Sequence, residues 1–210
     1  MITRFLILAN VIAFAWEMYV GGFGVLTNGV PLRSRVDDFI LYPIAVTQWH
    51  QYYRMLTAGF LHANGIHIAV NMVSLASLGA FVEREIGSTR FAVVYFFSLI
   101  VSSLAVVAFS APDVPTLGAS GAIFGIFGAL FAIGFKYGAP GMELIKANLG
   151  ILAFNLIFTF TVSFISKQAH VGGLIAGFLL TLAIFWPRRP VQPVVVDAQT
   201  GVPLESQIEP

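Results

Sequence analysis

The sequence predicts an all-α polytopic membrane protein with six transmembrane helices and a long membrane-associated first loop. The chain is 58% hydrophobic and only 10% charged, far from the composition of a soluble domain. Apolar runs of roughly 18 or more residues, the length of a membrane-crossing helix, recur along the chain. Glycine, proline and charged residues gather between these runs, where they would end each helix.

The first span is predicted over residues 3–20, with Trp16 and Tyr19 near its end as interfacial anchors. Arg4 and the apolar run after it could pass for a signal peptide. No small-residue cleavage site precedes a soluble domain, so we expect an uncleaved span. The connection that follows extends to residue 66 and includes the aromatic and polar stretch 49–54. This aromatic content favours a folded loop lying in the membrane interface over a tether.

Five further apolar runs follow, separated by residues that end helices. The second span ends at charged residues before Gly87, the fourth before Gly138, and the sixth before Pro187. The stretch from Pro190 onward contains four prolines, and few large apolar residues follow Val196. We therefore expect one membrane domain over residues 1–189 and a disordered cytoplasmic tail over residues 190–210. The five spans are predicted over residues 67–81, 91–109, 117–135, 144–165 and 169–186.

Six spans would place both termini on one side of the membrane. With both termini in the cytoplasm, that side carries seven lysines and arginines and the other side carries four, a bias that favours this orientation. The seven are Arg4, Arg84, Arg90, Lys136, Lys146, Arg188 and Arg189, and the four are Arg33, Arg35, Arg54 and Lys167. The sequence thus predicts a multi-pass protein of the cell (inner) membrane with cytoplasmic termini.

The composition argues against several classes of function. A net charge of +1 gives no reason to expect nucleic acid as a partner. Because cysteine is absent, disulfides, thiolate metal sites and a cysteine nucleophile are excluded. The sequence has no H-E-x-x-H zinc motif and no pair of aspartates inside the spans, which argues against the zinc and aspartate classes of intramembrane protease. We expect neither a metal nor another cofactor.

Ser120 lies between small residues at the start of the very apolar fourth span. The glycines on either side remove bulk, so that the hydroxyl can be approached closely. The N-terminus of a helix also offers unpaired N–H groups to a developing negative charge. These are the surroundings of a serine nucleophile. The alternative is that small residues here only let two membrane helices pack together.

The predicted topology brings polar residues of three helices to one depth. Spans two, four and six all enter the membrane from the outer side, with His67 and Asn71, Ser120, and His170 near their respective starts. His67 and Asn71 are four residues apart and share one helix face. Ionisable residues inside spans are costly and point to a functional site.

These residue types fit serine-protease chemistry. His170 would take the Ser120 proton and return it to the leaving amine. Asn71, His67 and the Ser120 backbone N–H would stabilise the oxyanion. We expect a Ser–His dyad without a third carboxylate, because the acidic residues considered lie in loops, in the tail or at the far end of span two. They are Asp37, Asp38, Asp113, Asp197 and Glu83. His170 would then be oriented by packing on the ring of Phe124.

Glycines are expected to set the distance between the two dyad helices. Gly121 and Gly125 form a small-residue face on span four, and Gly173 and Gly177 form one on span six. Such faces allow close backbone approach between membrane helices.

At these residues the chain resembles the rhomboid family of intramembrane serine proteases, over about residues 3–186. The resemblance implies Ser120 as nucleophile, His170 as base, and His67 with Asn71 in the oxyanion hole. It also implies a six-helix core, of the minimal prokaryotic form, whose active site faces the extracytoplasmic side. The matching motifs are Gly118-Ala119-Ser120-Gly121 with Ala122 and Gly125, Ala169-His170-Val171-Gly172-Gly173 with Gly177, His67-Ile68-Ala69-Val70-Asn71, and Tyr53-Arg54 before Phe60-Leu61-His62.

The chain departs from the family pattern in three places. Tyr53-Arg54 replaces the Trp-Arg pair often found in the first loop, Phe124 replaces a tyrosine, and Ala58 replaces an occasional histidine. The resemblance also suggests a structural cluster of Glu83 with Thr3 and Ser88. Phenylalanines of span five and the loop 163–168 are candidates for a gate through which substrate enters between spans two and five. The phenylalanines are Phe154, Phe158, Phe160 and Phe164.

The resemblance implies cleavage of membrane proteins with a single span, near the outer surface. The cleaved segment would be easily unwound and would have small side chains at the cleaved position, because helical backbone is not accessible to attack. The alternative is a non-catalytic rhomboid-like protein that binds transmembrane helices. A small transporter or channel is disfavoured, because its polar groups would lie at the midplane rather than near one surface.

Overall fold

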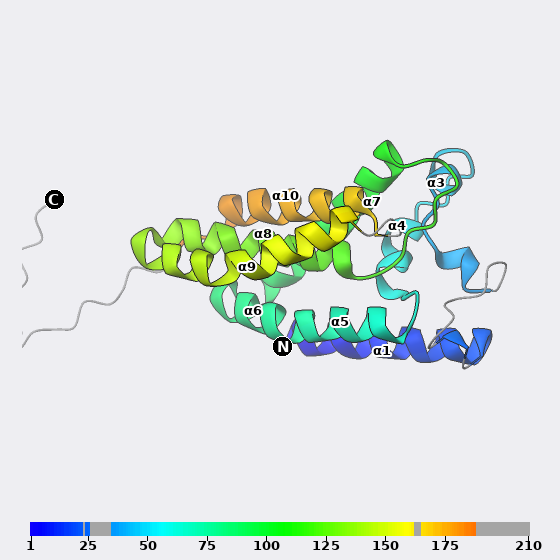
Figure 1. The fold of residues 1–210 in the computed structure, drawn as a ribbon, viewed down its shortest axis with the longest axis horizontal. Coiled ribbons are helices and arrows are strands. Elements are labelled where there is room, and N and C mark those ends of the chain that lie inside the picture. The colour runs from blue at the N-terminus through cyan, green and yellow to red at the C-terminus, as the bar shows by residue number, and fades with distance from the viewer. Residues whose placement is uncertain (23, 26–34, 162–164, 188–210) are drawn as a thin grey trace, which may run out of the picture.

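The computed structural model of the chain is a bundle of helices with a helical loop at one end (Figure 1). It describes residues 1–22, 24–25, 35–161 and 165–187. In these ranges there is no β-sheet, and Leu41 and Thr116 form an isolated antiparallel bridge. The predicted all-α membrane fold is confirmed.

Five helices of the described chain are long and apolar enough to cross a membrane. They are α1 (Ile2–Gly21), the continuous helix Gly65–Ile86, α7 (Ser88–Phe109), α8 (Ser120–Tyr137) and α10 (Lys167–Ile184). A further helix of 23 residues, α9 (Ala139–Thr161), occupies the position of the predicted fifth span. The count of six spans stays a prediction.

The six long helices begin one to five residues away from the predicted starts, and the starts of α8 and α9 have clear local causes. α8 begins at Ser120, not at Leu117, because Gly118 adopts a φ of +122° and Thr116 pairs with Leu41. α9 begins at Ala139, five positions before the predicted start at 144, and directly follows Gly138, whose φ is +68°. Proline at the second position of α9 suits a first helical turn, where its missing N–H costs nothing.

The second span contains an irregular turn. α5 (Gly65–Ser74) continues through a π-helical turn, η3 (Leu75–Gly79), into α6 (Ala80–Ile86). The Asn64 side chain caps α5 by accepting the His67 N–H at 2.9 Å, and Gly87, with a φ of +83°, ends α6. The cap fixes the residue where the helix begins, and therefore the depth at which His67 projects from it.

α8 is the central helix of the bundle. Of its most apolar stretch of 18 residues, 72% is buried inside the protein, against 28–44% in the other four long apolar helices. The buried face is rich in small residues, and α7 and α10 pack against it. A helix whose apolar residues are buried on all sides holds its first residue, Ser120, in a fixed position.

Glycines let α8 and α10 touch backbone to backbone. A Cβ atom on Gly173 would collide with the Gly121 carbonyl, and one on Gly177 would collide with the Gly125 carbonyl. Because both pairs step by four residues in the same direction, the two helices run parallel. Ser120 and His170 therefore lie at the same end of the pair.

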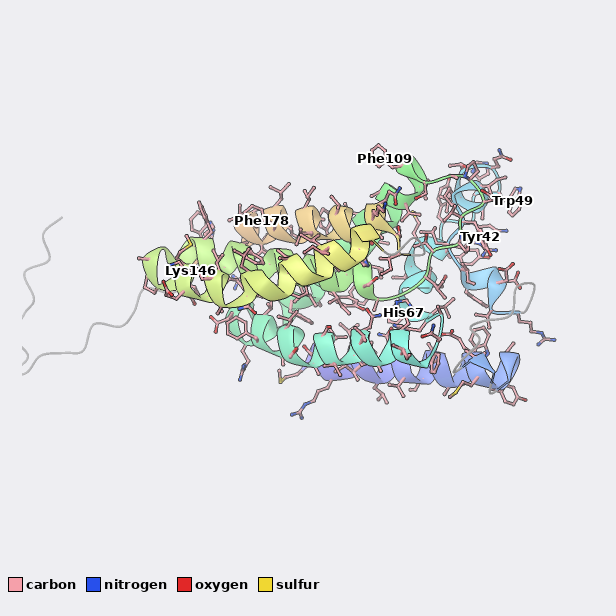
Figure 2. All side chains as sticks on the ribbon, in the orientation of Figure 1. Tyr42, Trp49, His67, Phe109, Lys146 and Phe178 are labelled. Carbon is pink, nitrogen blue, oxygen red and sulfur yellow. The ribbon has the colours of Figure 1, made fainter. Side chains whose placement is uncertain are left out.

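The described part of the first loop folds around Arg54. Its guanidinium is buried and donates to the Asp37 carbonyl at 2.6 Å, the Ile40 carbonyl at 2.7 Å and the Gln51 side chain at 2.6 Å. This part of the loop contains four short helical segments: η1 (Asp37–Phe39), α3 (Pro43–Thr47), α4 (Arg54–Thr57), which begins with Arg54, and η2 (Ala58–Phe60). Trp49 lies at this end of the bundle and Lys146 at the opposite end (Figure 2).

At the other end of the bundle, Glu83 joins the starts of α1 and α7 to α6. Its buried carboxylate accepts from the Ile2 N–H at 2.7 Å, the Thr3 N–H at 2.9 Å, the Thr3 hydroxyl at 2.6 Å and the Ser88 hydroxyl at 2.6 Å. The predicted association of Glu83 with Thr3 and Ser88 is present in the structure.

Glu83→Ala is expected to destabilise the protein by about 2–3 kcal/mol, because the buried Thr3 on α1, and Ser88 on α7, lose their shared acceptor. The melting temperature in detergent measures this change. Glu85→Ala is the matched control, since Glu85 accepts only a surface bond from the Tyr137 hydroxyl at 3.0 Å. Equal melting temperatures for the two variants would contradict the role of Glu83.

Several sequence predictions fall outside the described residues. The tail 190–210 and the domain boundary at 189 lie there, as do the side chains of Phe154, Phe158, Phe160 and Phe164. The disorder of the tail and the gate through span five stay predictions.

Candidate active site

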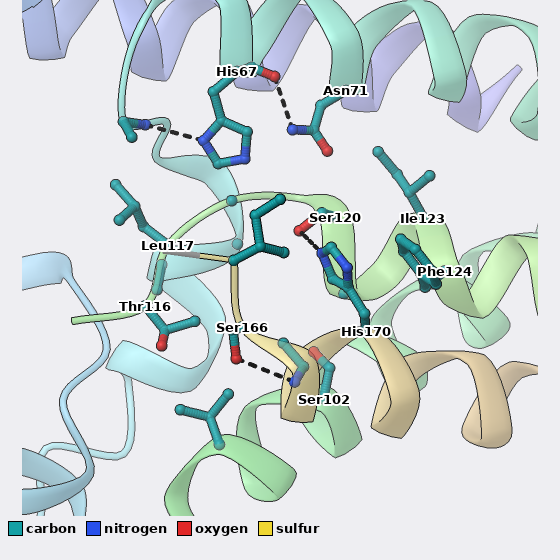
Figure 3. Close-up of a pocket in the computed structure, with 18 of the residues that line it drawn as sticks. His67, Asn71, Ser102, Thr116, Leu117, Ser120, Ile123, Phe124, Ser166 and His170 are labelled. Atoms are coloured by element: carbon teal, nitrogen blue, oxygen red, sulfur yellow. Dashed lines mark hydrogen bonds between the residues drawn. The ribbon is translucent and has the colours of Figure 1, made fainter. Parts of the chain in front are cut away.

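A cavity of about 470 Å³ opens among the starts of α5, α8 and α10. Figure 3 shows Ser120 and His170 on one side of it and His67 with Asn71 on the other. Ser102 and Ser103 of α7, Thr159 of α9 and the segment 115–118 complete its wall. The four polar residues singled out in the sequence therefore line one cavity.

Ser120 is the first residue of α8, and the segment before it is anchored to the first loop. Thr116 exchanges two backbone hydrogen bonds with Leu41, and the Gly118 N–H donates to the Ala58 carbonyl at 2.9 Å. The Ser120 Oγ lies 2.8 Å from the His170 Nε2. This distance is short enough for the hydroxyl to donate its proton directly to the ring.

His170 lies in the first turn of α10, where Ser166 caps the helix. The Ser166 hydroxyl accepts the Ala169 N–H at 3.2 Å. The His170 ring stacks on Phe124 with a centroid distance of 4.1 Å and an interplanar angle of 15°. The packing of His170 on Phe124 that the sequence suggested is present, and phenylalanine supplies the same face as the tyrosine that it replaces.

The second ring nitrogen of His170 has a partner that sequence reasoning missed. The Oγ1 of Thr159 lies 2.7 Å from the His170 Nδ1. Thr159 lies in α9, eleven residues before His170, and is buried. A single threonine in an apolar helix belongs to no sequence motif, so its contact with His170 is seen only once α9 is packed in the structure.

His67 presents one edge of its ring to Gly118, which lies just before α8. Its Nδ1 accepts the Ala63 N–H at 3.2 Å, so the neutral ring carries its proton on Nε2. A Cβ on Gly118 would lie 2.7 Å from the His67 Cε1 and 2.9 Å from its Nε2. Both this close approach and the positive φ of Gly118 require glycine there.

Asn71 lies one turn after His67 and is buried. Its amide nitrogen donates to the His67 carbonyl at 2.8 Å. The amide carries a second N–H, which can serve an acceptor in the cavity. The hydrogen bond to the His67 carbonyl holds the amide in place to do so.

A second buried pair, Glu17 and His62, lies behind His67, and the sequence reasoning overlooked Glu17. The two oxygens of the Glu17 carboxylate accept the backbone N–H of His62 at 3.0 and 3.2 Å. The His62 ring lies 5.1 Å from the His67 ring. Burial, and then the nearby His67, lower the pKa of His62 to about 3, so His62 is neutral at neutral pH. The acid supports the loop before α5, and it lies inside the apolar first span rather than in a loop.

Among the described residues no group of three His, Cys, Asp or Glu side chains is arranged to hold a metal ion. The polar groups that line the cavity include a hydroxyl, an imidazole and N–H donors. Such a set can transfer an acyl group: one group attacks, one carries the proton and the others stabilise negative charge.

Comparison with known proteins gives a consistent result. The family model described as the Rhomboid domain matches residues 49–187. Rhomboid protease GluP of Bacillus subtilis (strain 168) is 40% identical over 146 residues, covering 69% of this chain and 28% of that protein. Putative rhomboid protease YdcA of the same strain is 36% identical over 132 residues, covering 62% of this chain and 66% of that protein.

A plant relative is named differently. Inactive RHOMBOID-like protein 8 of Arabidopsis thaliana is 35% identical over 140 residues, covering 63% of this chain and 38% of that protein. The matches to all three relatives span less than two thirds of their lengths. Similarity of this degree joins proteins with and without activity, so the function has to be argued from the site itself.

Proposed function

Because this chain belongs to the rhomboid family, we propose that it is an intramembrane serine protease that cleaves membrane proteins with a Ser120–His170 dyad. The observation that carries the proposal is the 2.8 Å contact between the Ser120 Oγ and the His170 Nε2 at the wall of a cavity. A hydroxyl beside an imidazole is the arrangement that makes serine nucleophilic.

The proposed reaction proceeds in two steps. The Ser120 Oγ attacks the peptide carbonyl carbon while His170 Nε2 takes the hydroxyl proton. His170 then gives that proton to the nitrogen of the breaking C–N bond, which leaves an acyl ester on Ser120. In the second step His170 takes a proton from water, the hydroxide attacks the ester, and the Ser120 oxygen leaves with the proton from His170.

The negative charge on the tetrahedral oxygen needs donors. The second N–H of Asn71, the Nε2–H of His67 and the backbone N–H of Ser120 are the groups proposed for this role. Gly118 has no side chain between His67 and the nucleophile helix, which leaves the room that an oxyanion would occupy.

Asn71→Ala is expected to lower kcat about 100-fold, because one preorganised donor to the oxyanion is lost. The ratio of kcat values is measured with one substrate for the wild type, for Asn71→Ala and for a control variant. Asn148→Ala is the matched control: Asn148 also donates to the carbonyl one turn back, at 2.9 Å, but on α9 and away from the cavity. A kcat for Asn71→Ala equal to that of the control would remove Asn71 from the oxyanion hole.

The proposed substrate is a membrane protein with one span, cleaved near the extracytoplasmic surface where the segment unwinds. The cavity supports this, because apolar side chains such as Leu99, Val106 and Phe127 line it beside the polar group. The proposed setting is the cell (inner) membrane, with both termini cytoplasmic and the cavity facing outward. Parallel α8 and α10 carry Ser120 and His170 at one end of the bundle, as this orientation requires.

The test is cleavage in liposomes. Wild type and Ser120→Ala would be reconstituted with a tagged single-span substrate whose span contains glycine near its outer end, and products would be read by mass spectrometry. We expect cuts near that end with wild type only. Binding without cleavage by both proteins would instead support the non-catalytic helix-binding alternative, in keeping with a relative that is named inactive.

A further inference from the structure

The partner of the His170 Nδ1 is a threonine from a different helix. The Thr159 Oγ1 lies 2.7 Å from this nitrogen, and the two residues are 1% and 7% exposed. Thr159 lies in the last turn of α9, and His170 lies in the first turn of α10. A buried contact this short is a well-formed hydrogen bond, and its direction depends on where the ring proton lies.

The proton on the ring can be placed by following the bond at Nε2. For Ser120 to donate its proton, the Nε2 of neutral His170 must carry none, so the proton sits on Nδ1. The Nδ1–H then donates to the Thr159 oxygen. A threonine hydroxyl inside a helix can direct its own proton to a carbonyl one turn back, which leaves its oxygen able to accept.

We propose that Thr159 is a positioning residue that holds His170 in the tautomer and orientation needed to accept the Ser120 proton. The inference rests on the proposed protease function and adds a third member to the Ser–His pair. Three contacts fix the ring: Ser120 at Nε2, Thr159 at Nδ1 and Phe124 on its face. Without the bond at Nδ1, the ring can carry its proton on either nitrogen or turn about its axis.

A neutral hydroxyl suits this place better than a carboxylate would. The site is buried among membrane helices, where an ionised acid carries a large desolvation cost. A threonine oxygen accepts the same N–H without adding a charge. It stabilises the imidazolium less than a carboxylate does, so the effect of removing it is expected to be correspondingly smaller than the loss of an aspartate from a catalytic triad.

The contact also links α9 to the catalytic base. Thr159 and Ile165 line the cavity on either side of the end of α9, and Ser166 follows at the cap of α10. A displacement of α9 by the length of one hydrogen bond would therefore break the bond between Thr159 and the His170 Nδ1. His170 has both of its ring nitrogens bonded only when α9 packs beside it.

The test compares three variants in detergent: Thr159→Val, which keeps the shape but removes the acceptor; Thr159→Ser, which restores it; and Thr181→Val as a matched control. Thr181 is a buried threonine of α10 that does not line the cavity. The first readout is the 15N spectrum of the His170 ring, assigned by its loss in His170→Gln. The second is kcat and KM for the same tagged single-span substrate, presented in that detergent.

We expect the wild-type ring to be protonated on Nδ1 in the neutral state, and the Thr159→Val ring to shift toward protonation on Nε2. We expect kcat of Thr159→Val to fall about tenfold, the factor that one such hydrogen bond represents, with KM unchanged. Thr159→Ser should restore both the spectrum and kcat, and Thr181→Val should change neither.

Two outcomes would overturn the inference: a Thr159→Val ring that keeps the wild-type tautomer, or a kcat of Thr159→Val equal to that of the control. A wild type that binds but never cleaves would overturn the proposed protease function instead. The ring spectrum still decides the role of Thr159 in that case, because it needs no turnover.

Discussion

His170→Ala is expected to lower kcat by a factor on the order of 10⁴–10⁶, with little change in KM. The Ser120 hydroxyl has the His170 Nε2 as its partner at 2.8 Å. Without this base the hydroxyl keeps its proton in the attacking step, and the leaving amine receives none. Substrate contacts with the rest of the cavity remain, so binding persists while turnover stops.

His50→Asn is the control for the loss of a histidine elsewhere. His50 lies exposed in the first loop with a φ of 56°, which asparagine adopts readily. We expect wild-type kcat for this variant in the same liposome assay. If His170→Ala kept more than about a tenth of wild-type kcat, a smaller loss than removing a general base causes, His170 would not be the base.

The second large effect is expected from Gly173→Ala. The added methyl group would collide with the carbonyl of Gly121, one residue after Ser120. Because the obstacle is backbone, α8 and α10 must move apart, which separates Ser120 from His170. Overpacking of this kind costs about 1–3 kcal/mol, or about 3–10 °C in melting temperature, and we expect kcat to fall together with stability.

Gly150→Ala provides the matched control for Gly173→Ala. Gly150 also lies inside a helix, α9, but a Cβ atom there meets no atom within 4 Å. Replacing glycine by alanine in an open helical position stabilises slightly, by about 0.5–1 kcal/mol. Loss of activity in both variants, or in neither, would contradict the claim that backbone contact between α8 and α10 sets the dyad distance.

Much of the fold follows from the sequence, because membrane helices are specified by local composition. An apolar run of sufficient length can satisfy its backbone only as a helix, so the spans follow from hydropathy. Their ends are less well specified. Gly118 shows why: its positive φ, together with the pairing of Thr116 with Leu41, delays the start of α8 to Ser120, and that pairing involves a segment distant in sequence.

The candidate site divides in the same way. Ser120, His170, His67 and Asn71 could be singled out because polar residues near the starts of apolar spans are costly and stand out. Thr159 and Glu17 could not. Threonine is common in membrane helices, and whether it meets His170 depends on the packing of α9 against α10. Glu17 lies inside the predicted first span, and its contact with the His62 backbone joins residues 45 positions apart in the sequence.

The most direct test of the account is to find which residue reacts with a serine-directed probe. Purified wild type in mild detergent would be treated with a fluorophosphonate, digested and analysed by mass spectrometry, beside Ser120→Ala and His170→Ala. The account predicts an adduct on Ser120 in the wild type and none in either variant. A folded wild type that carries no adduct on Ser120, with this probe and with a second serine-reactive class, would contradict it.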